Sequence, residues 1–157
     1  MALGRHVKVL SRGAPHLLAD ATNVERTLRE LVSLLGMRLL GKPHIYEVET
    51  EIAKLNVEPF EDEGGVTGVC VLSTSHCAIH TWPLRPFFVM DVYSCRDFDT
   101  ARLERHLAMN LGAYDTQVTD LSFALDYSFA KDGGPSPIRT KRSGRDPLHG
   151  WPSKDAG

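Results

Sequence analysis

The chain has 157 residues, of which 42% are apolar, and this length suits one domain with a modest hydrophobic core. Its net charge of −2 gives no sign of a surface for nucleic acid, and no apolar run is long enough to span a bilayer. No leader peptide is recognisable, so we expect a cytoplasmic protein with no nucleic-acid or membrane partner. The three cysteines, Cys70, Cys77 and Cys95, lack metal-type spacing, which favours reduced thiols over disulfides.

The N-terminal part of the chain contains one strong helix signal. Residues 1–13 carry few structural signals and are interpreted as an N-terminal extension with room for an edge strand. A first core strand is expected over residues 16–20. Residues 22–25, Thr-Asn-Val-Glu, match a capping box, and apolar residues at helical spacing behind them predict a helix over residues 23–35.

The middle of the chain is rich in strand signals. Residues 45–57 contain many β-branched side chains and predict one bent strand or two short ones. Residues 66–72 form a continuous run of small apolar side chains, which predicts a strand buried, or nearly buried, on both faces. Two further strands are expected over residues 78–82 and 87–94, because prolines separate these extended runs.

The C-terminal part predicts a second helix, capped by Asp99 and ended by Gly112, and a last strand over residues 121–129. Residues 131–157 are rich in Gly, Pro and Ser and predict a disordered tail. The order of elements predicts an α+β domain over residues 14–130. We expect a two-layer sandwich with two helices on one face of an antiparallel sheet.

Reactive side chains are concentrated in residues 73–83, between two predicted strands. His76 and His80 are four residues apart, but in a strand they would lie roughly 13 Å from each other, too far to share an ion. The segment therefore predicts no metal site. Ser75 lacks the glycine-flanked elbow of a hydrolase nucleophile, although a triad without a local motif stays open. The remaining interpretation is purely structural, with both histidines at half-buried strand positions and without a chemical role.

The same segment resembles the core of bacterial S-adenosylmethionine decarboxylase proenzymes. In that family a Ser-His pair is followed by Ile-His-Thr-Trp-Pro, as in residues 75–83, and then by a segment like Asp-Val-Tyr-Ser-Cys at residues 91–95. Residues 65–69, Gly-Val-Thr-Gly-Val, are similar to the family's strand before its cleavage site. The resemblance covers residues 14–129 and rests mainly on residues 65–95.

This resemblance implies that the chain cleaves itself between Thr74 and Ser75 and converts Ser75 into a covalent pyruvoyl cofactor. It implies that Ser75 Oγ attacks the Thr74 carbonyl, that His80 assists the elimination, and that Thr67 supports the oxyoxazolidine intermediate. In the processed enzyme, the pyruvoyl group would form a Schiff base with the substrate amine. Cys95 matches the family's proton donor.

The resemblance also implies a homodimer of processed protomers, each with chains 1–74 and 75–157 and with active sites near the interface. The implied reaction is the decarboxylation of S-adenosylmethionine in spermidine biosynthesis. Cys70 and Cys77 match no family role and are interpreted as small buried apolar residues.

Two residues depart from the family pattern. Thr74 replaces a glutamate before the cleavage site, and Leu84 replaces a glutamate whose carboxylate can hold the ribose hydroxyls. Losing that carboxylate is expected to weaken nucleoside binding by roughly 1.5–3 kcal/mol. The resemblance places Phe60, Leu72 and Leu84 at substrate-binding positions, with the spacing of Phe60 one residue longer than usual.

Two alternative functions follow from these departures. One is a pyruvoyl-dependent L-ornithine or L-arginine decarboxylase, in which Asp20 or Asp91 would hold the distal cation of the substrate. The other is an uncleaved paralogue with a binding or regulatory role. Retention of Ser75, His80 and Cys95 favours an enzyme.

Overall fold

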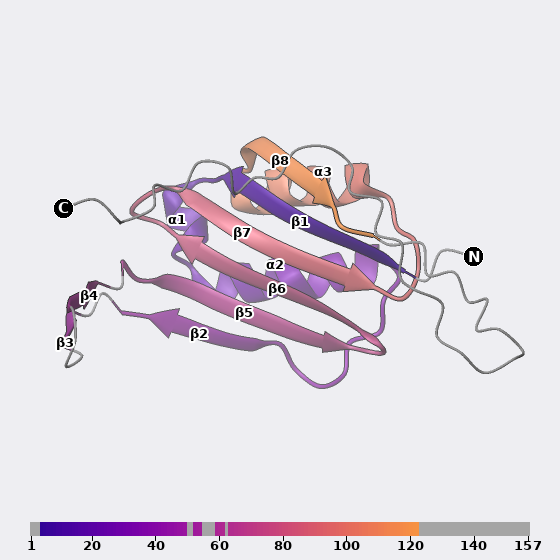
Figure 1. Cartoon of the computed structure of the whole chain (residues 1–157), viewed down its shortest axis with the longest axis horizontal. Coiled ribbons are helices and arrows are strands. Elements are labelled where there is room, and N and C mark those ends of the chain that lie inside the picture. Colours follow the sequence, from indigo (N-terminus) through magenta and orange to yellow (C-terminus); the bar gives the residue numbers. More distant parts are fainter. Residues whose placement is uncertain (1–3, 50–51, 55–58, 62, 123–157) are drawn as a thin grey trace, which may run out of the picture. The chain divides into compact units, whose positions relative to one another are not determined.

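Six strands form one antiparallel sheet in the computed structural model, which describes residues 4–49, 52–54, 59–61 and 63–122. The order across the sheet is β2-β5-β6-β7-β1-β8 (Figure 1). These strands span Arg5–Arg12 (β1), His44–Val48 (β2), Gly65–Leu72 (β5), Ser75–Trp82 (β6), Phe87–Ser94 (β7) and Tyr114–Asp120 (β8). A separate two-stranded sheet pairs β3 (Ile52–Lys54) with β4 (Pro59–Glu61). The expected tail, residues 131–157, lies outside the described residues.

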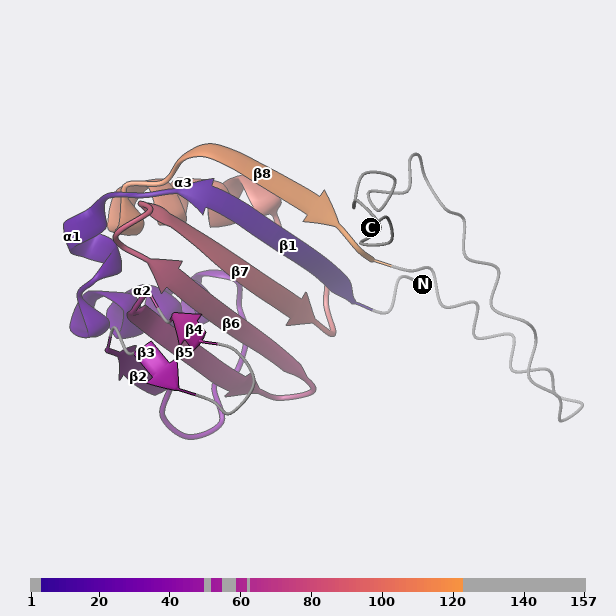
Figure 2. The same cartoon turned by 60° about the vertical axis from the view of Figure 1, so that its left-hand side comes forward.

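Three helices cover one face of the six-stranded sheet (Figures 1 and 2). They are the short α1 (Pro15–Leu18), α2 (Ala21–Leu34) and α3 (Thr100–Leu111). Apolar side chains of α2 and α3 and of the facing strand positions make up the hydrophobic core. The expected α+β class and antiparallel sheet are confirmed, with a third, very short helix added. We call the opposite side of the sheet, which carries none of the described helices, the outer face.

The two long helices begin at aspartate caps. The side chain of Asp20 accepts the Asn23 N–H at 3.0 Å, so Asp20, and not Thr22 of the expected capping box, caps α2. The side chain of Asp99 accepts the Ala101 N–H at 2.8 Å, as predicted for α3. Gly112 ends α3 in the left-handed conformation, with φ of 63°.

The sequence prediction is wrong in two places near the N-terminus, and its last expected strand lies mostly outside the described residues. Residues 16–20 form α1 and the cap of α2 instead of a strand, because Pro15 suits a first helical turn. β1 lies between β7 and β8, so residues 5–12 are an interior strand and not an extension with an edge strand. The last described strand is β8, at 114–120, whereas 123–129 of the expected strand lie outside the described residues.

Side chains of β5 alternate between the two faces of the sheet. Val66, Cys70 and Leu72 are buried toward the helices, whereas Val71 on the outer face is 47% exposed. The expectation that residues 66–72 are buried on both faces is therefore wrong for the single chain. Alternate residues of this apolar run therefore belong to two surfaces, the face packed against the helices and the outer face.

Gly68, in the Gly-Val-Thr-Gly-Val motif of β5, lies where α2 packs closely against the sheet. A Cβ at this position would lie 2.8 Å from Leu28 Cδ1 and 2.8 Å from Ile45 Cδ1. Both contacts are well inside van der Waals distance, so a side chain here would force Leu28 of α2 and Ile45 of β2 to repack.

We expect Gly68→Ala to lower the free energy of unfolding by about 1–3 kcal/mol, the usual cost of overpacking a core. Met109→Ala is the control, because Met109 is 83% exposed and should change stability by at most about 0.5 kcal/mol. Urea unfolding followed by circular dichroism measures both changes. Equal midpoints for Gly68→Ala and the unsubstituted protein would contradict the close packing.

Candidate active site

The predicted cleavage site lies in the tight turn between β5 and β6. Leu72 pairs with Ser75, so Ser73 and Thr74 alone form the hairpin loop. Thr74 has φ of 56°, a left-handed conformation that a β-branched residue adopts at a cost. Strained backbone of this kind costs of order 1–3 kcal/mol and persists only where its surroundings hold it. The strain therefore sits on the residue that carries the carbonyl of the predicted scissile bond.

Ser75 and Cys95 meet at this turn, although they are 20 residues apart in the sequence. The Cys95 backbone N–H donates to Ser75 Oγ at 2.9 Å. The Cys95 thiol reaches toward the Ser73 carbonyl oxygen, at 3.9 Å. Cys95 directly follows β7, the neighbour of β6, so pairing of these two strands produces the contact. We call Ser73, Thr74, Ser75 and Cys95 the turn cluster.

Hydrogen bonds within the turn cluster change the acidity of Cys95. Hydroxyl groups of Thr74 and then Ser75 stabilise the thiolate and hold the pKa of the Cys95 thiol below its usual range, with a smaller contribution from the Arg96 charge. The Thr74 hydroxyl also lies 2.7 Å from the Ser73 carbonyl, which competes for its single proton. Cys95 is exposed, so its thiol is also accessible to reagents and substrate.

Thr67 and His80 form a second group on the outer face. They are directly opposite in the pairing of β5 with β6, and Thr67 Oγ1 lies 3.1 Å from His80 Nδ1. The His80 ring is also near Trp82, with 6.3 Å between the ring centres. The hydroxyl group of Thr67 can thus orient the imidazole of His80 through this hydrogen bond.

The structure does not bring His80 to Ser75 within one chain. Five residues of extended strand separate them, which corresponds to roughly 16 Å. Strand alternation also directs Ser75 toward the buried side of β6 and His80 toward the outer face. The predicted catalytic residues therefore form two groups at opposite ends of β6.

The three predicted substrate-binding residues lie in different surroundings. The side chain of Phe60 lies outside the described residues, and Leu72 is buried in the core. Leu84 is 74% exposed in the turn between β6 and β7, where the resemblance placed a carboxylate. Arg85 in the same turn pairs with Glu63, which brings a carboxylate beside it. Asp20, one of the two residues suggested to bind the distal cation of ornithine or arginine, instead caps α2 with its carboxylate.

Asp91 instead belongs to a cluster on the outer face with His6 and His76. His6 Nε2 lies 3.0 Å from Asp91 Oδ1, and His76 Nε2 lies 3.0 Å from the same oxygen. Burial raises the pKa of Asp91, but hydrogen bonds from His76 and His6 outweigh it and leave the pKa below its ordinary value. Sequence reasoning missed His6, because only the register of β1 with β7 shows that it is a neighbour of Asp91.

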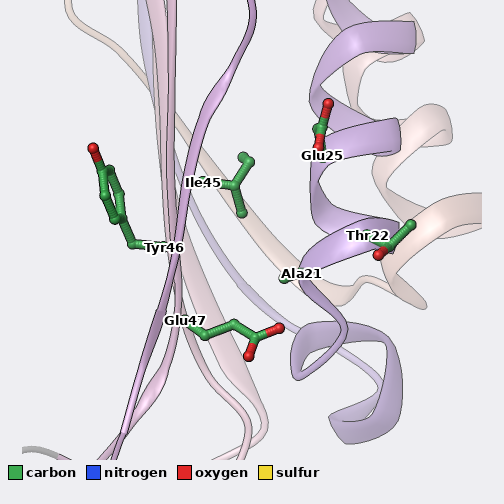
Figure 3. Close-up of a pocket in the computed structure, with 6 residues that line it drawn as sticks. All are labelled: Ala21, Thr22, Glu25, Ile45, Tyr46 and Glu47. Carbon is green, nitrogen blue, oxygen red and sulfur yellow. The ribbon is translucent and has the colours of Figure 1, made fainter.

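A cavity of about 450 Å³ lies between the start of α2 and the edge strand β2 (Figure 3). Glu25 on α2 and Glu47 on β2 give it an acidic character, and Tyr46 points to the other side of the strand. None of the predicted site residues lines it.

The described part of the chain contains no helix that is long and apolar enough to cross a membrane.

A model of the S-adenosylmethionine decarboxylase family matches residues 7–122. An S-adenosylmethionine decarboxylase proenzyme of Thermomicrobium roseum is 33% identical over 94 residues, which cover 60% of this chain and 69% of the relative. One of Carboxydothermus hydrogenoformans is 33% identical over 113 residues, covering 71% and 79%. The solved adenosylmethionine decarboxylase of Aquifex aeolicus has a TM-score of 0.59 at 23% identity, covering 80% of this chain and 95% of the other.

The chain therefore belongs to the S-adenosylmethionine decarboxylase family. This membership confirms the resemblance drawn from residues 65–95, and the match to a solved structure supports the fold described above.

The three cysteines should react very differently with an alkylating reagent. The pKa of Cys95 is lowered, whereas burial raises the pKa of Cys70 to about 11 and raises that of Cys77 further. Iodoacetamide at pH 8 should therefore modify one thiol of the native protein, and peptide mass spectrometry should locate it at Cys95. The other two should react only in denaturant. Modification of Cys77 in the folded protein at a similar rate would contradict this assignment.

The Thr74 hydroxyl can be tested in the same assay. Thr74→Val keeps the β-branched shape but removes the hydroxyl, so the pH at which Cys95 alkylation is half-maximal should rise. Thr74→Ser retains the hydroxyl and is the matched control.

Proposed function

We propose that the chain is a self-processing, pyruvoyl-dependent S-adenosylmethionine decarboxylase of cytoplasmic spermidine biosynthesis. The observation that carries the proposal is the turn cluster, in which Ser75 Oγ is held by the Cys95 N–H beside the left-handed Thr74. Family membership and the proenzyme names of its relatives support the same reading. Ser75, Cys95, Thr67 and His80 carry the roles that the resemblance assigns to them.

Processing uses the chain's own groups. Ser75 Oγ attacks the Thr74 carbonyl carbon, the C–N bond between the two residues breaks, and an ester joins Thr74 to Ser75 Oγ. Removal of the Ser75 α-proton then breaks the Cβ–O bond, which releases the Thr74 carboxylate and leaves dehydroalanine at position 75. Its enamine tautomerises to an imine, water adds, and ammonia leaves. The left-handed Thr74 favours the first step, because cleavage relieves its backbone strain.

The surroundings of Ser75 fit a pyruvoyl group. When formed, this group supplies a carbonyl that reacts with the substrate amine and accepts the electrons left by carbon dioxide. The Cys95 N–H that now contacts Ser75 Oγ can orient an oxygen at the same place. The Cys95 thiol, exposed beside the turn, is positioned to deliver a proton to the decarboxylated carbon.

The separation of Ser75 from His80 favours a homodimer in which each site uses both protomers. A two-fold axis passing over the middle of β6 would reverse the direction of this strand in the partner. The end of β6 that carries Ser75 would then face the end that carries His80 of the partner subunit. The outer-face residue midway along β6 is Ala78, whose small side chain permits two sheets to approach closely.

The outer face has the composition expected of such an interface. Tyr46 is 63% exposed there and Val71 is 47% exposed, because the described helices all lie on the other face of the sheet. Trp82 and Phe87 stack on each other on the same face, with 4.7 Å between ring centres. Packing this face against a second copy would bury exposed apolar area and unite the two groups of catalytic residues.

Leu84 bears on the choice of substrate, because it stands where the family carries a carboxylate. An ion pair with Arg85 brings the carboxylate of Glu63 to this turn. We assign S-adenosylmethionine because relatives matching most of the described chain bear that name. L-Ornithine and L-arginine are the competing substrates.

Intact-protein mass spectrometry tests processing. The purified protein should give chains of residues 1–74 and 75–157, the second beginning with pyruvoyl. Ser75→Ala should remain one chain because it lacks the attacking hydroxyl group. Cys95→Ala keeps the backbone N–H, so it should be cleaved but should release carbon dioxide roughly a hundredfold more slowly.

Two outcomes of these measurements would overturn the proposal. A single unmodified chain under all conditions would favour an uncleaved binding protein. Faster release of carbon dioxide from ¹⁴C-carboxyl-labelled ornithine or arginine than from labelled S-adenosylmethionine would reassign the substrate while leaving the processing intact.

Shared sites can be tested by mixing two inactive variants. Ser75→Ala loses the turn cluster and His80→Gln loses the outer-face pair, so each alone should be inactive. Co-expression should restore roughly a quarter of normal activity, because half of the dimers are mixed and each of those has one intact site. Activity no higher than the sum of the two variants would contradict a site built from both protomers.

A further inference from the structure

Three neighbouring strands present metal-binding side chains at one point of the outer face. His6 comes from β1, Asp91 from β7 and His76 from β6, and their ligand atoms all lie within 4.8 Å of one another. Asp91 Oδ2 is 3.1 Å from His6 Nε2, in addition to the Oδ1 contacts with both histidines. Each histidine thus directs its Nε2 atom toward the same carboxylate.

The sheet holds these side chains in place. His6 and His76 both pair with Tyr93, one on each side, so the two histidines occupy one row across three strands. The Tyr93 ring packs against both imidazoles, with 5.7 Å to His6 and 5.8 Å to His76 between ring centres. Asp91 lies two residues before Tyr93 on the same face of β7. This pre-arranged geometry lowers the entropic cost of binding a common ligand.

We propose that His6 Nε2, His76 Nε2 and a carboxylate oxygen of Asp91 bind a divalent transition-metal ion such as Zn²⁺. Two imidazoles and one carboxylate suit Zn²⁺ and neighbouring first-row ions, whereas Mg²⁺ and Ca²⁺ prefer oxygen ligands. Three protein ligands leave a further coordination position open to water or a second donor.

The distances agree with this assignment. Bonds of about 2.0–2.2 Å from Zn²⁺ to nitrogen and oxygen place tetrahedral ligand atoms roughly 3.3–3.5 Å apart. The two 3.0 Å contacts and the 4.8 Å limit bracket that separation, so small side-chain rotations suffice to admit the ion. In the sequence analysis, the spacing of His76 and His80 argued against these two histidines sharing one metal ion. The second imidazole comes instead from His6, on another strand.

The three ligands are separate from the residues that carry the proposed enzyme chemistry, and they lie on the outer face that the proposed dimer would cover. His76 follows Ser75, but none of the three ligands belongs to the turn cluster or to the Thr67–His80 pair. The test therefore uses the Ser75→Ala protein, expressed without a polyhistidine tag and treated with a chelator. Its metal binding does not depend on cleavage, on a pyruvoyl group or on the identity of the substrate.

The metal-free protein is titrated with Co²⁺, whose visible absorption reports its coordination, and then with Zn²⁺ in competition and by calorimetry. We expect one ion per chain and bands of four- or five-coordinate Co²⁺ that Zn²⁺ displaces. His6→Gln and Asp91→Asn should each weaken binding at least about tenfold. His44→Gln is the matched control, because His44 is an exposed histidine on the outer face of β2 and lies outside the cluster.

Two results would refute the metal site. Absence of saturable Co²⁺ and Zn²⁺ binding would identify the cluster as a hydrogen-bonded network only. An equal loss of affinity in His44→Gln and His6→Gln would place the ion elsewhere on the surface. Circular dichroism and the urea midpoint of each variant establish that the fold is retained, and the double variant His6→Gln/His76→Gln gives the background binding.

Discussion

The pairing of β6 with β5 on one side and β7 on the other is the constraint on which every proposed site depends. It sets Thr67 opposite His80 and Ser75 opposite Leu72, and it brings Cys95 to the Ser75 hydroxyl. A slip of one residue in either ladder would invert the faces of a whole strand. The buried side chains of β6, Cys77, Ile79 and Thr81, oppose such a slip. Packing against the helices therefore fixes the register that positions reactive groups on both faces.

In the turn between β5 and β6, the surrounding strands hold a strained backbone conformation in place. The left-handed Thr74 is costly by itself, but paired strands on both sides of the loop leave little freedom to relax. The loop ends are also tied to a neighbouring segment, because the Ser73 N–H donates to the Arg38 carbonyl at 3.0 Å. The energy that stabilises the sheet thus maintains an unfavourable conformation at one peptide unit. This is the unit at which the proposed processing would act.

Sequence alone predicts the elements whose signals are local. The aspartate and glycine at the ends of α3 and the apolar spacing of α2 locate both helices, and the motif between Gly65 and Cys95 identifies the family. The edge strand β8 was not predicted, because most of its residues are polar and are exposed on both faces. The interior place of β1, and with it the meeting of His6 with Asp91, depends on partners about 85 residues away. Spacing within one segment cannot reveal contacts made across three strands.

The interior position of β1 also determines what cleavage would do to the protein. After a break between Thr74 and Ser75, β2, β5 and β1 would belong to one chain, and β6, β7 and β8 to the other. Because β1 lies between β7 and β8, and β5 remains paired with β6, the two chains would interlock across the sheet. The helices also link the two chains, since the side-chain amide of Asn23 in α2 donates a hydrogen bond to the Asn110 carbonyl of α3 at 2.9 Å. Separating the chains would require breaking three strand pairings and opening the core. The fold therefore tolerates a broken backbone at this turn, which makes the turn a suitable place for a self-made cofactor.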